Sequence, residues 1–217
     1  MSSPFDDTFT GADGSSPNPI IWTVVGTPTI QSNTLEIVND DEYVVCKLTF
    51  TGDFNIQVDF ATQSEPATNY WTADLLAYID GTHYVGGRAS YNSGKKFQSF
   101  YINGGSLAYD TATRTNTYGK LKLTRTGNSF SIYDADGAGG FSLLGTHTIG
   151  SAGNQVSIWI RCQHWGASPN ITCRFDNFLI NSGYTSRTNN CVSLSTCDVA
   201  TEGEETPSGK DRFFLVF

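Results

Sequence analysis

Strict alternation of apolar and polar residues is the pattern that most limits what this chain can fold into. In residues 54–60, with the sequence FNIQVDF, every second residue is apolar. Residues 44–50, 121–124 and 156–162 repeat the pattern. Successive side chains of a β-strand point to opposite faces, so each segment predicts a strand with one buried and one wet face.

Short turn sequences separate the predicted strands. They are the dipeptides Asp80-Gly81, Asn103-Gly104 and Gly127-Asn128. Such pairs favour tight hairpins between antiparallel strands, and no segment shows the 3.6-residue periodicity of an amphipathic helix. We therefore predict an all-β fold, an antiparallel two-sheet jelly-roll sandwich with an extended C-terminal tail. An up-and-down barrel is the alternative.

The two ends of the chain predict one domain followed by a tail. Residues 5–9 and 175–183 are expected to be the first and last strands of a sandwich over residues 1–183. Beyond it, residues 184–217 are a polar linker that includes an acidic run and ends in apolar residues. These last residues are predicted to anchor the protein on a partner by strand addition, and they are Phe213, Phe214, Leu215, Val216 and Phe217.

Charge and hydropathy exclude several partners. The formal net charge is −8, whereas binding to nucleic-acid phosphates needs clustered Lys and Arg. We expect no membrane partner either, because no apolar run approaches the roughly 18 residues of a transmembrane helix. Residues 1–4 lack the features of a signal peptide, so we expect that the protein does not leave its cell by general secretion.

The five cysteines match no zinc pattern. Cys162 and Cys173 flank a predicted loop, residues 163–172, and are predicted to face each other across a hairpin. Cys191 and Cys197 lie in the tail, where a local disulfide is a second prediction. The alternative for all of them is a reduced thiol, and for Cys46 a small buried core residue is the expectation.

Several segments together resemble the concanavalin A-like lectin/glucanase superfamily, especially its laminin-G-like members. They are FDDTF at 5–9 with GADG at 11–14 and Trp22, LKLTRTGNSF at 121–130 followed by Asp136-Gly137, and FDNF at 175–178. The resemblance implies a sandwich with a convex and a concave sheet, the latter often used for glycans. Lectins, hydrolases and proteins that bind no small ligand share this fold, so function depends on the sites.

Glycosidases of this superfamily carry a Glu-x-Asp-x-Glu run, or a similar spacing, on one strand, so that two carboxyl groups flank the sugar bond. The sequence contains no such run, and three of its six glutamates lie in the tail. We therefore predict no catalytic residues and no enzymatic activity. A glycoside hydrolase with unusual carboxylates is an alternative.

Aromatic and polar residues around the central hairpins are candidates for glycan binding, because sugars bind to flat aromatic faces beside polar groups. The candidates are Trp71, Tyr84, Arg88, Tyr91, His164 and Trp165. The alternative is that Trp71 and Tyr84 fill the core of the sandwich.

We expect no cofactor, with a structural calcium ion as the one alternative. The superfamily often binds such an ion near the terminal strands, and Asp7 and Asp176 lie close together if those strands pair. Calcium prefers more oxygen ligands than these two residues supply. Hydrogen bonding of Asp176 to turn amides is therefore an alternative.

An acidic lectin-like sandwich without a signal peptide, rich in Thr, Ser, Asn and Gly, resembles bacteriophage virion proteins. We therefore expect a non-enzymatic virion component, such as a capsid decoration, fibre or tail-associated protein, made in the host cytoplasm. Its partners are other virion proteins or copies of itself, with a cell-surface glycan as a further ligand. The alternatives are a free, extracellular carbohydrate-binding lectin and an unrecognised glycoside hydrolase.

Overall fold

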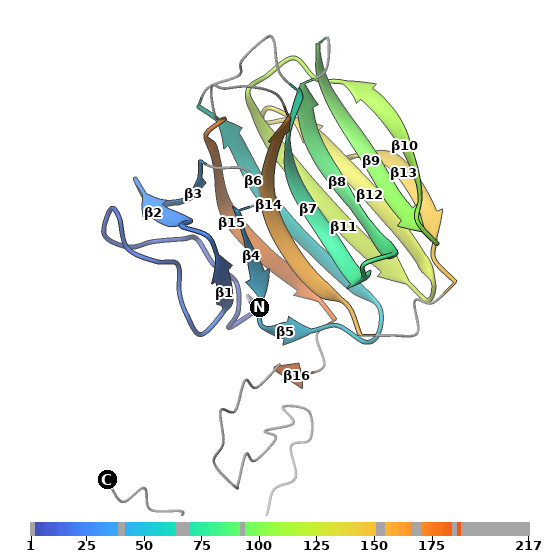
Figure 1. Ribbon diagram of the computed structural model, residues 1–217, viewed down its shortest axis with the longest axis horizontal. Helices are drawn as coiled ribbons and strands as arrows, with labels where there is room; N and C mark the ends of the chain where they lie inside the picture. Colours follow the sequence, from blue (N-terminus) through green and yellow to red (C-terminus); the bar gives the residue numbers. More distant parts are fainter. Residues whose placement is uncertain are drawn as a thin grey trace, which may run out of the picture.

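Two seven-stranded antiparallel sheets pack face to face (Figure 1). The computed structural model describes residues 3–38, 42–63, 70–91, 94–150, 155–165, 171–183 and 186–187, with no helix among them. The predicted all-β, two-sheet sandwich is confirmed. In the described part of the chain, no helix is long and apolar enough to cross a membrane.

The first sheet has the strand order β1-β4-β14-β7-β8-β9-β10. Its strands are β1 (Trp22–Val25), β4 (Glu42–Cys46), β14 (Ser157–Trp165), β7 (Tyr70–Asp80), β8 (His83–Tyr91), β9 (Lys95–Asn103) and β10 (Ser106–Thr113). The strand β14, late in the sequence, therefore lies between two early strands near the middle of this sheet.

The second sheet has the order β13-β12-β11-β6-β15-β3-β2 and lies behind the first in Figure 1. Its strands are β13 (Ser142–Thr148), β12 (Ser129–Asp136), β11 (Tyr118–Thr126), β6 (Phe54–Thr62), β15 (Cys173–Ser182), β3 (Thr34–Ile37) and β2 (Thr29–Gln31). A separate two-stranded ladder joins β5 (Leu48–Thr49) to β16 (Ser186–Arg187).

The alternating segments fold as their pattern predicts. In β6, Phe54, Ile56, Val58 and Phe60 face the core, and none is more than 3% exposed. The predicted turns connect β7 to β8, β9 to β10 and β11 to β12. Gly127 has a φ of 58° in the last of these turns, a value that glycine adopts at little cost.

A glycine also sets the distance between the sheets. Gly87 of β8 faces the core, where a Cβ on it would lie only 2.7 Å from Ile132 Cγ2 of the second sheet. A larger residue would push the sheets apart, so the close packing at this point depends on glycine.

The N-terminal segment closes the sandwich without forming a regular strand. Asp7 and Phe178 exchange two backbone hydrogen bonds of 2.9 Å, which is an isolated bridge. The Trp22 ring contacts the rings of Phe9 and Phe178, with centroid distances of 5.6 and 4.9 Å. The ends of the domain therefore meet as expected, but the interpretation of residues 5–9 as a strand is wrong.

Cys162 and Cys173 lie buried in the core with their sulfur atoms 3.1 Å apart. They meet across the core and not across a hairpin, because β14 belongs to the first sheet and β15 to the second. Disulfide formation between them stays a prediction.

Most of the predicted tail lies outside the described residues. This applies to Cys191, Cys197 and the apolar residues 213–217. The division at residue 183 and the anchoring role of the tail therefore stay predictions.

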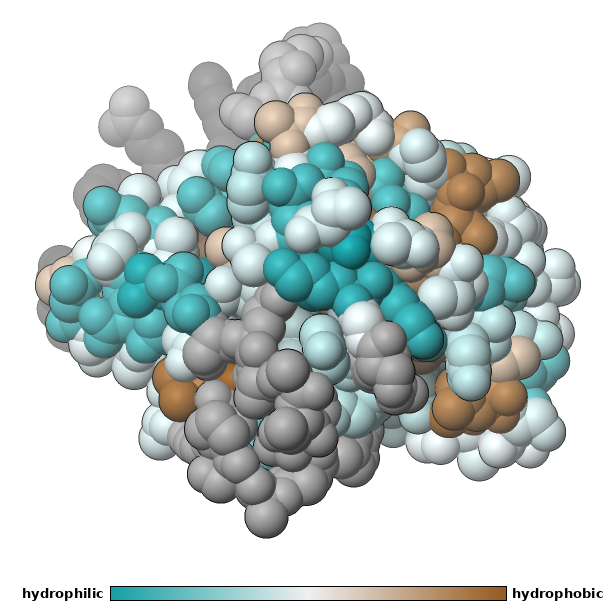
Figure 2. Space-filling view, turned by 90° about the horizontal axis from the view of Figure 1, so that it is seen from above, coloured by the Kyte–Doolittle hydropathy of each residue, from teal (hydrophilic) through white to brown (hydrophobic). Residues whose placement is uncertain are grey.

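Hydrophobic surface occurs in separate patches. Seen from above, hydrophilic residues cover the middle of the molecule, and hydrophobic patches lie at the right, the side of β10 and β13, with another at the lower left (Figure 2). These two strands are at the edges of their sheets, and they expose Leu107 and Leu143.

Candidate functional site

A row of polar side chains crosses the outer face of the first sheet. Arg161 of β14 is opposite Asp74 of β7, which is opposite Arg88 of β8, which is opposite Gln98 of β9. Residues directly opposite each other in a sheet project to the same face. The residues that alternate with Asp74 on β7, such as Ala73 and Leu75, belong to the core, so this row points outward.

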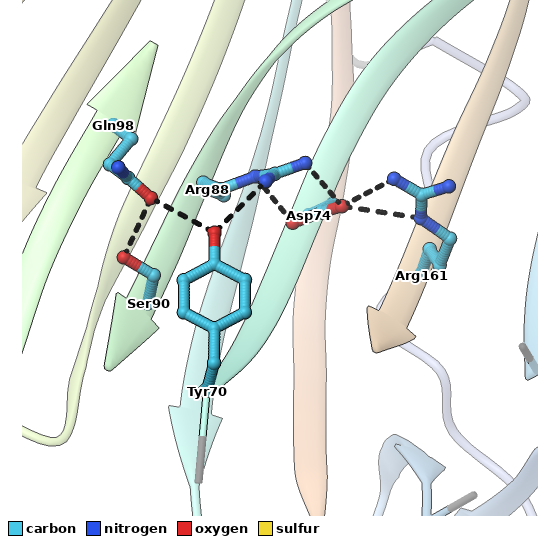
Figure 3. A network of polar contacts seen from close by, with 6 residues as sticks. All are labelled: Tyr70, Asp74, Arg88, Ser90, Gln98 and Arg161. Atoms are coloured by element: carbon cyan, nitrogen blue, oxygen red, sulfur yellow. Dashed lines mark hydrogen bonds and ion pairs between the residues drawn. The ribbon is translucent and has the colours of Figure 1, made fainter. Parts of the chain in front are cut away.

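We call this row and its two neighbours the polar network (Figure 3). Its members are Tyr70, Asp74, Arg88, Ser90, Gln98 and Arg161.

Asp74 is the centre of the polar network. Its Oδ2 accepts hydrogen bonds from Arg161 Nη2 at 2.7 Å, Arg161 Nε at 3.2 Å and Arg88 Nη2 at 3.3 Å. Its Oδ1 lies 3.2 Å from Arg88 Nε. The Asp74 side chain is 0% exposed, whereas those of Arg88 and Arg161 are 10% and 15% exposed. The two guanidinium groups, and not the carboxylate, are therefore the charged groups that solvent reaches.

The remaining contacts hold Arg88 in place. Its Nη1 donates to the Tyr70 hydroxyl at 3.4 Å, and that hydroxyl donates to Gln98 Oε1 at 3.5 Å, both long for hydrogen bonds. Ser90 Oγ donates to the same Gln98 oxygen at 3.0 Å. The guanidinium lies over the ring of Phe100, with its carbon 3.7 Å from the ring centroid, a cation–π geometry.

Beside the polar network runs a line of stacked rings, which we call the aromatic row. Its members are Tyr43 of β4, Trp159 of β14, Tyr78 of β7 and Tyr84 of β8. The centroid distances along it are 4.5 Å from Tyr43 to Trp159, 4.5 Å from Trp159 to Tyr78 and 6.2 Å from Tyr78 to Tyr84. All four rings are partly exposed, so a ligand on this face meets flat aromatic surface next to charged and polar groups.

Two further polar atoms of this face are buried without a partner. Neither Thr72 Oγ1 nor Trp159 Nε1 has a hydrogen-bond partner among the described residues. Thr72 is 0% exposed and lies on the same side of β7 as Asp74. Because buried polar groups are normally hydrogen-bonded, such atoms indicate a place where water or a ligand binds.

The structure places the six predicted glycan-binding residues in different environments. Arg88 belongs to the polar network and Tyr84 to the aromatic row. Trp71 lies in the core at 0% exposure, and Tyr91 packs against the core. His164 is opposite Trp71 in the ladder and therefore on the core side, and the side chain of Trp165 lies outside the described residues.

Sequence reasoning missed the centre of the site, which is Asp74 and Arg161. The one signal available was the alternating segment 156–162, which carries Trp159 and Arg161 on the same face. The pairing of that segment with β7 brings together residues 87 positions apart, and no local pattern encodes it.

Asp7 and Asp176 make mostly structural contacts. Asp7 accepts hydrogen bonds from the Phe9 amide at 2.7 Å and Trp22 Nε1 at 2.8 Å. Asp176 accepts one from the Asn177 amide at 2.7 Å, and burial raises its pKa, with the nearby carboxylates of Asp59 and Asp7 acting in the same direction. Among the described residues, no group of three or more His, Cys, Asp or Glu is placed to hold a metal ion. A calcium ion here stays a prediction.

A second polar cluster contains a serine, a histidine and an aspartate but not a catalytic triad. Ser99 Oγ lies 2.8 Å from His147 Nε2 and donates to Asp110 Oδ2 at 3.1 Å. Asp110 lies 3.8 Å from that same Nε2, whereas a triad needs the carboxylate at the other ring nitrogen. Burial lowers the pKa of His147, and Asp110 opposes the shift. The cluster therefore does not activate Ser99 as a nucleophile.

Comparison with known proteins finds similarity in structure alone. No family model matches the sequence, and no curated protein does. The GH43 protein BlXynB of Bacillus licheniformis is similar with a TM-score of 0.64 and 13% identity; the match covers 84% of this chain and 40% of that one. This chain thus corresponds to less than half of BlXynB.

Two further similar structures match over nearly their whole length. LamAcat of Zobellia galactanivorans has a TM-score of 0.61 and 11% identity, covering 82% of this chain and 96% of that one. Rv0315 of Mycobacterium tuberculosis, an immunostimulatory antigen and pseudo beta-1,3-glucanase, has a TM-score of 0.60 and 10% identity, covering 82% and 98%. Identities this low establish a shared fold, which is consistent with the concanavalin A-like jelly-roll superfamily.

These neighbours correct the functional expectation. They are glycoside hydrolase-fold proteins, and nothing in the comparisons points to a phage. The predictions of a virion component and of a protein without enzymatic activity are therefore wrong as leading interpretations. The alternative of a glycoside hydrolase is better supported.

Proposed function

We propose that the protein is carbohydrate-active and binds a saccharide chain along the outer face of the first sheet. The observation that carries this proposal is the position of the polar network directly beside the aromatic row, on one face of neighbouring strands. The fold shared with BlXynB and LamAcat supports the same class of ligand.

The chemistry of the face suits a sugar chain. Aromatic rings pack against the apolar faces of sugar rings, and guanidinium and amide groups donate hydrogen bonds to ring substituents. The row of opposite residues from Tyr43 to Gln98 crosses five neighbouring strands, which corresponds to roughly 20 Å at the usual strand spacing. That length accommodates a short oligosaccharide.

Hydrolysis of the bound chain is the second activity we propose, because the structural neighbours include a xylan beta-1,4-xylosidase. Glycoside hydrolysis normally uses two carboxyl groups on either side of the scissile bond. In the polar network, Asp74 is the one carboxylate, and Asp80 at the end of β7 is bound to Thr82 and His83. Asp74 is buried beneath Arg88 and Arg161, so the described residues of the network supply no carboxyl group that a sugar ring reaches, and a hydrolytic pair would include residues outside the network.

A polysaccharide panel tests both activities. Binding is measured by isothermal titration, and cleavage by release of reducing ends. Trp159→Ala is expected to weaken binding about tenfold or more, because it removes the central ring of the aromatic row. Tyr133→Ala is the matched control, because Tyr133 is a partly exposed ring of the second sheet beneath Lys122. Failure of the wild-type protein to bind any polysaccharide overturns the proposal.

Cleavage has its own readout and its own outcome. Reducing ends released by the wild-type protein are expected to fall in Trp159→Ala, because a polymer must bind before it is cleaved. Binding without release overturns hydrolysis and leaves saccharide binding in place.

A further inference from the structure

We infer that the face selects an anionic saccharide, whose carboxylate or sulfate group is bound by Arg88 and Arg161. This inference rests on the proposed saccharide binding and names the class of substrate.

The charges of the polar network do not balance. Two guanidinium groups share the single carboxylate of Asp74, which leaves one positive charge in excess. Lys96 of β9 is opposite Ser90 and therefore on the same face, which adds a second cation. The whole protein has a formal charge of −8, so the polar network together with Lys96 has the opposite sign to the molecule as a whole.

The two arginines of the polar network are accessible to a ligand, whereas the aspartate is not. Asp74 is fully buried beneath the guanidinium groups, while both arginines keep part of their side chains exposed. Arg161 uses Nε and Nη2 on Asp74, and its Nη1 bonds to none of the described residues. A guanidinium with free N–H groups on one edge binds the oxygens of a carboxylate or sulfate through paired hydrogen bonds.

The site is also preorganised. The contact with Phe100 and the bond to Tyr70 fix the plane of Arg88, and the bonds to Asp74 fix that of Arg161. Little side-chain entropy is then lost when an anion binds, which favours affinity. The unpartnered Thr72 hydroxyl and the Trp159 indole N–H provide further donors on this face, and donors suit an anionic ligand.

The test compares polymers that share a backbone and differ in whether their substituent is charged. Polygalacturonate is compared with its fully methyl-esterified form, and a sulfated galactan with its desulfated form, by isothermal titration at one ionic strength. The expected result is binding about ten- to a hundredfold tighter for at least one anionic polymer than for its neutral partner, the range for charge-assisted hydrogen bonds. The pair that shows the difference identifies the group as a carboxylate or a sulfate.

The variants test whether these arginines cause the preference. Arg161→Gln is expected to reduce affinity for the anionic polymer to about that for the neutral one, without weakening the neutral one. Arg161→Lys is expected to retain part of the preference. Arg174→Gln is the control, because Arg174 forms an ion pair with Glu36 on the second sheet and is also partly exposed.

The outcomes separate the two proposals. Equal affinity for charged and neutral partners overturns the anionic preference and leaves saccharide binding standing, whereas no binding of any polymer overturns both. If Arg161→Gln does not fold, competition of free galacturonate against galactose on the wild-type protein decides the question. Galacturonate that displaces the bound polymer no better than galactose contradicts the inference.

Discussion

The outer faces of the two sheets differ in how their charged side chains are paired and buried. On the second sheet, charged residues form separate, partly exposed pairs: Lys120 with Asp59 at 3.3 Å, and Arg174 with Glu36 at 2.7 Å. On the first sheet, two arginines converge on one buried aspartate. Exposed pairs cost and contribute little, but buried charges carry a large desolvation penalty. Stability alone does not require such a cluster, and this is why we assign function to the first sheet.

The largest effect is expected from Asp74→Asn. The substitution leaves two guanidinium groups close together without their counter-ion, and breaking a buried ion pair costs about 3–5 kcal/mol. Urea unfolding at pH 7 measures the loss. Surface ion pairs contribute about 0–1 kcal/mol. If Asp74→Asn lowers the unfolding free energy by no more than that, Asp74 contributes no more to stability than the pairs of the second sheet, and the prediction is wrong.

An effect of intermediate size is expected from oxidation of Cys162 and Cys173. A disulfide between them would join β14, the strand that carries Arg161, to the second sheet, and closing a short loop stabilises by about 2–4 kcal/mol. Mild oxidation should remove two titratable thiols and raise the melting temperature. Cys162→Ser should abolish the rise, and a wild-type protein that keeps both thiols would disprove the pairing.

A smaller effect concerns Asp134, a buried carboxylate of the second sheet. Unlike Asp74, it has no cationic partner among the described residues; burial, followed by repulsion from Asp136, raises its pKa to about 6. Its folded pKa exceeds its unfolded one, so it destabilises the protein increasingly as pH rises from the usual aspartate range to about 6.

Asp134→Asn should therefore increase stability at pH 7, by on the order of 1–2 kcal/mol, and leave it little changed at pH 4. Urea unfolding at the two pH values measures the difference. A gain of equal size at both pH values would rule out titration of Asp134 as its cause.

The smallest effect is expected from Lys120→Met. Lys120 and Asp59 keep about a third and a quarter of their side chains exposed, and pairs of this kind contribute about 0–1 kcal/mol. The unfolding free energy should change by no more than that. If Lys120→Met lowered the unfolding free energy as much as Asp74→Asn, the charged residues of the two faces would not differ in their contribution to stability.

The sequence predicted those parts of the fold in which one strand face is wet. The alternation in residues 54–60 and 121–124 marks β6 and β11, whose outer sides meet solvent. The burial pattern of β7 is different, since seven consecutive residues from Trp71 to Ala77 are buried. No alternation distinguishes its faces, so nothing in the sequence placed Trp71 in the core and Asp74 outside it.

The sequence predicted only those residues of the candidate site that lie on one strand. Tyr84 and Arg88 are close in sequence and share one strand, so a local pattern could group them. Asp74, Arg161 and Trp159 join them through strand pairing between β7 and β14, which depends on the whole sheet. The prediction that the protein has no enzymatic activity depended on the absence of one motif, the Glu-x-Asp-x-Glu run. Proteins can share the fold of glycoside hydrolases without that motif, so its absence was a weak argument.

The position of β14 determines when this face comes into existence. The strands β4 and β7 are synthesised early, but the gap between them in the sheet is filled by residues 157–165. Until that segment leaves the ribosome, Asp74 has Arg88 as a partner and lacks Arg161. The aromatic row also lacks Trp159, whose ring stacks on those of Tyr43 and Tyr78. Such long-range pairing slows folding, so the site is complete only after nearly the whole domain has been made.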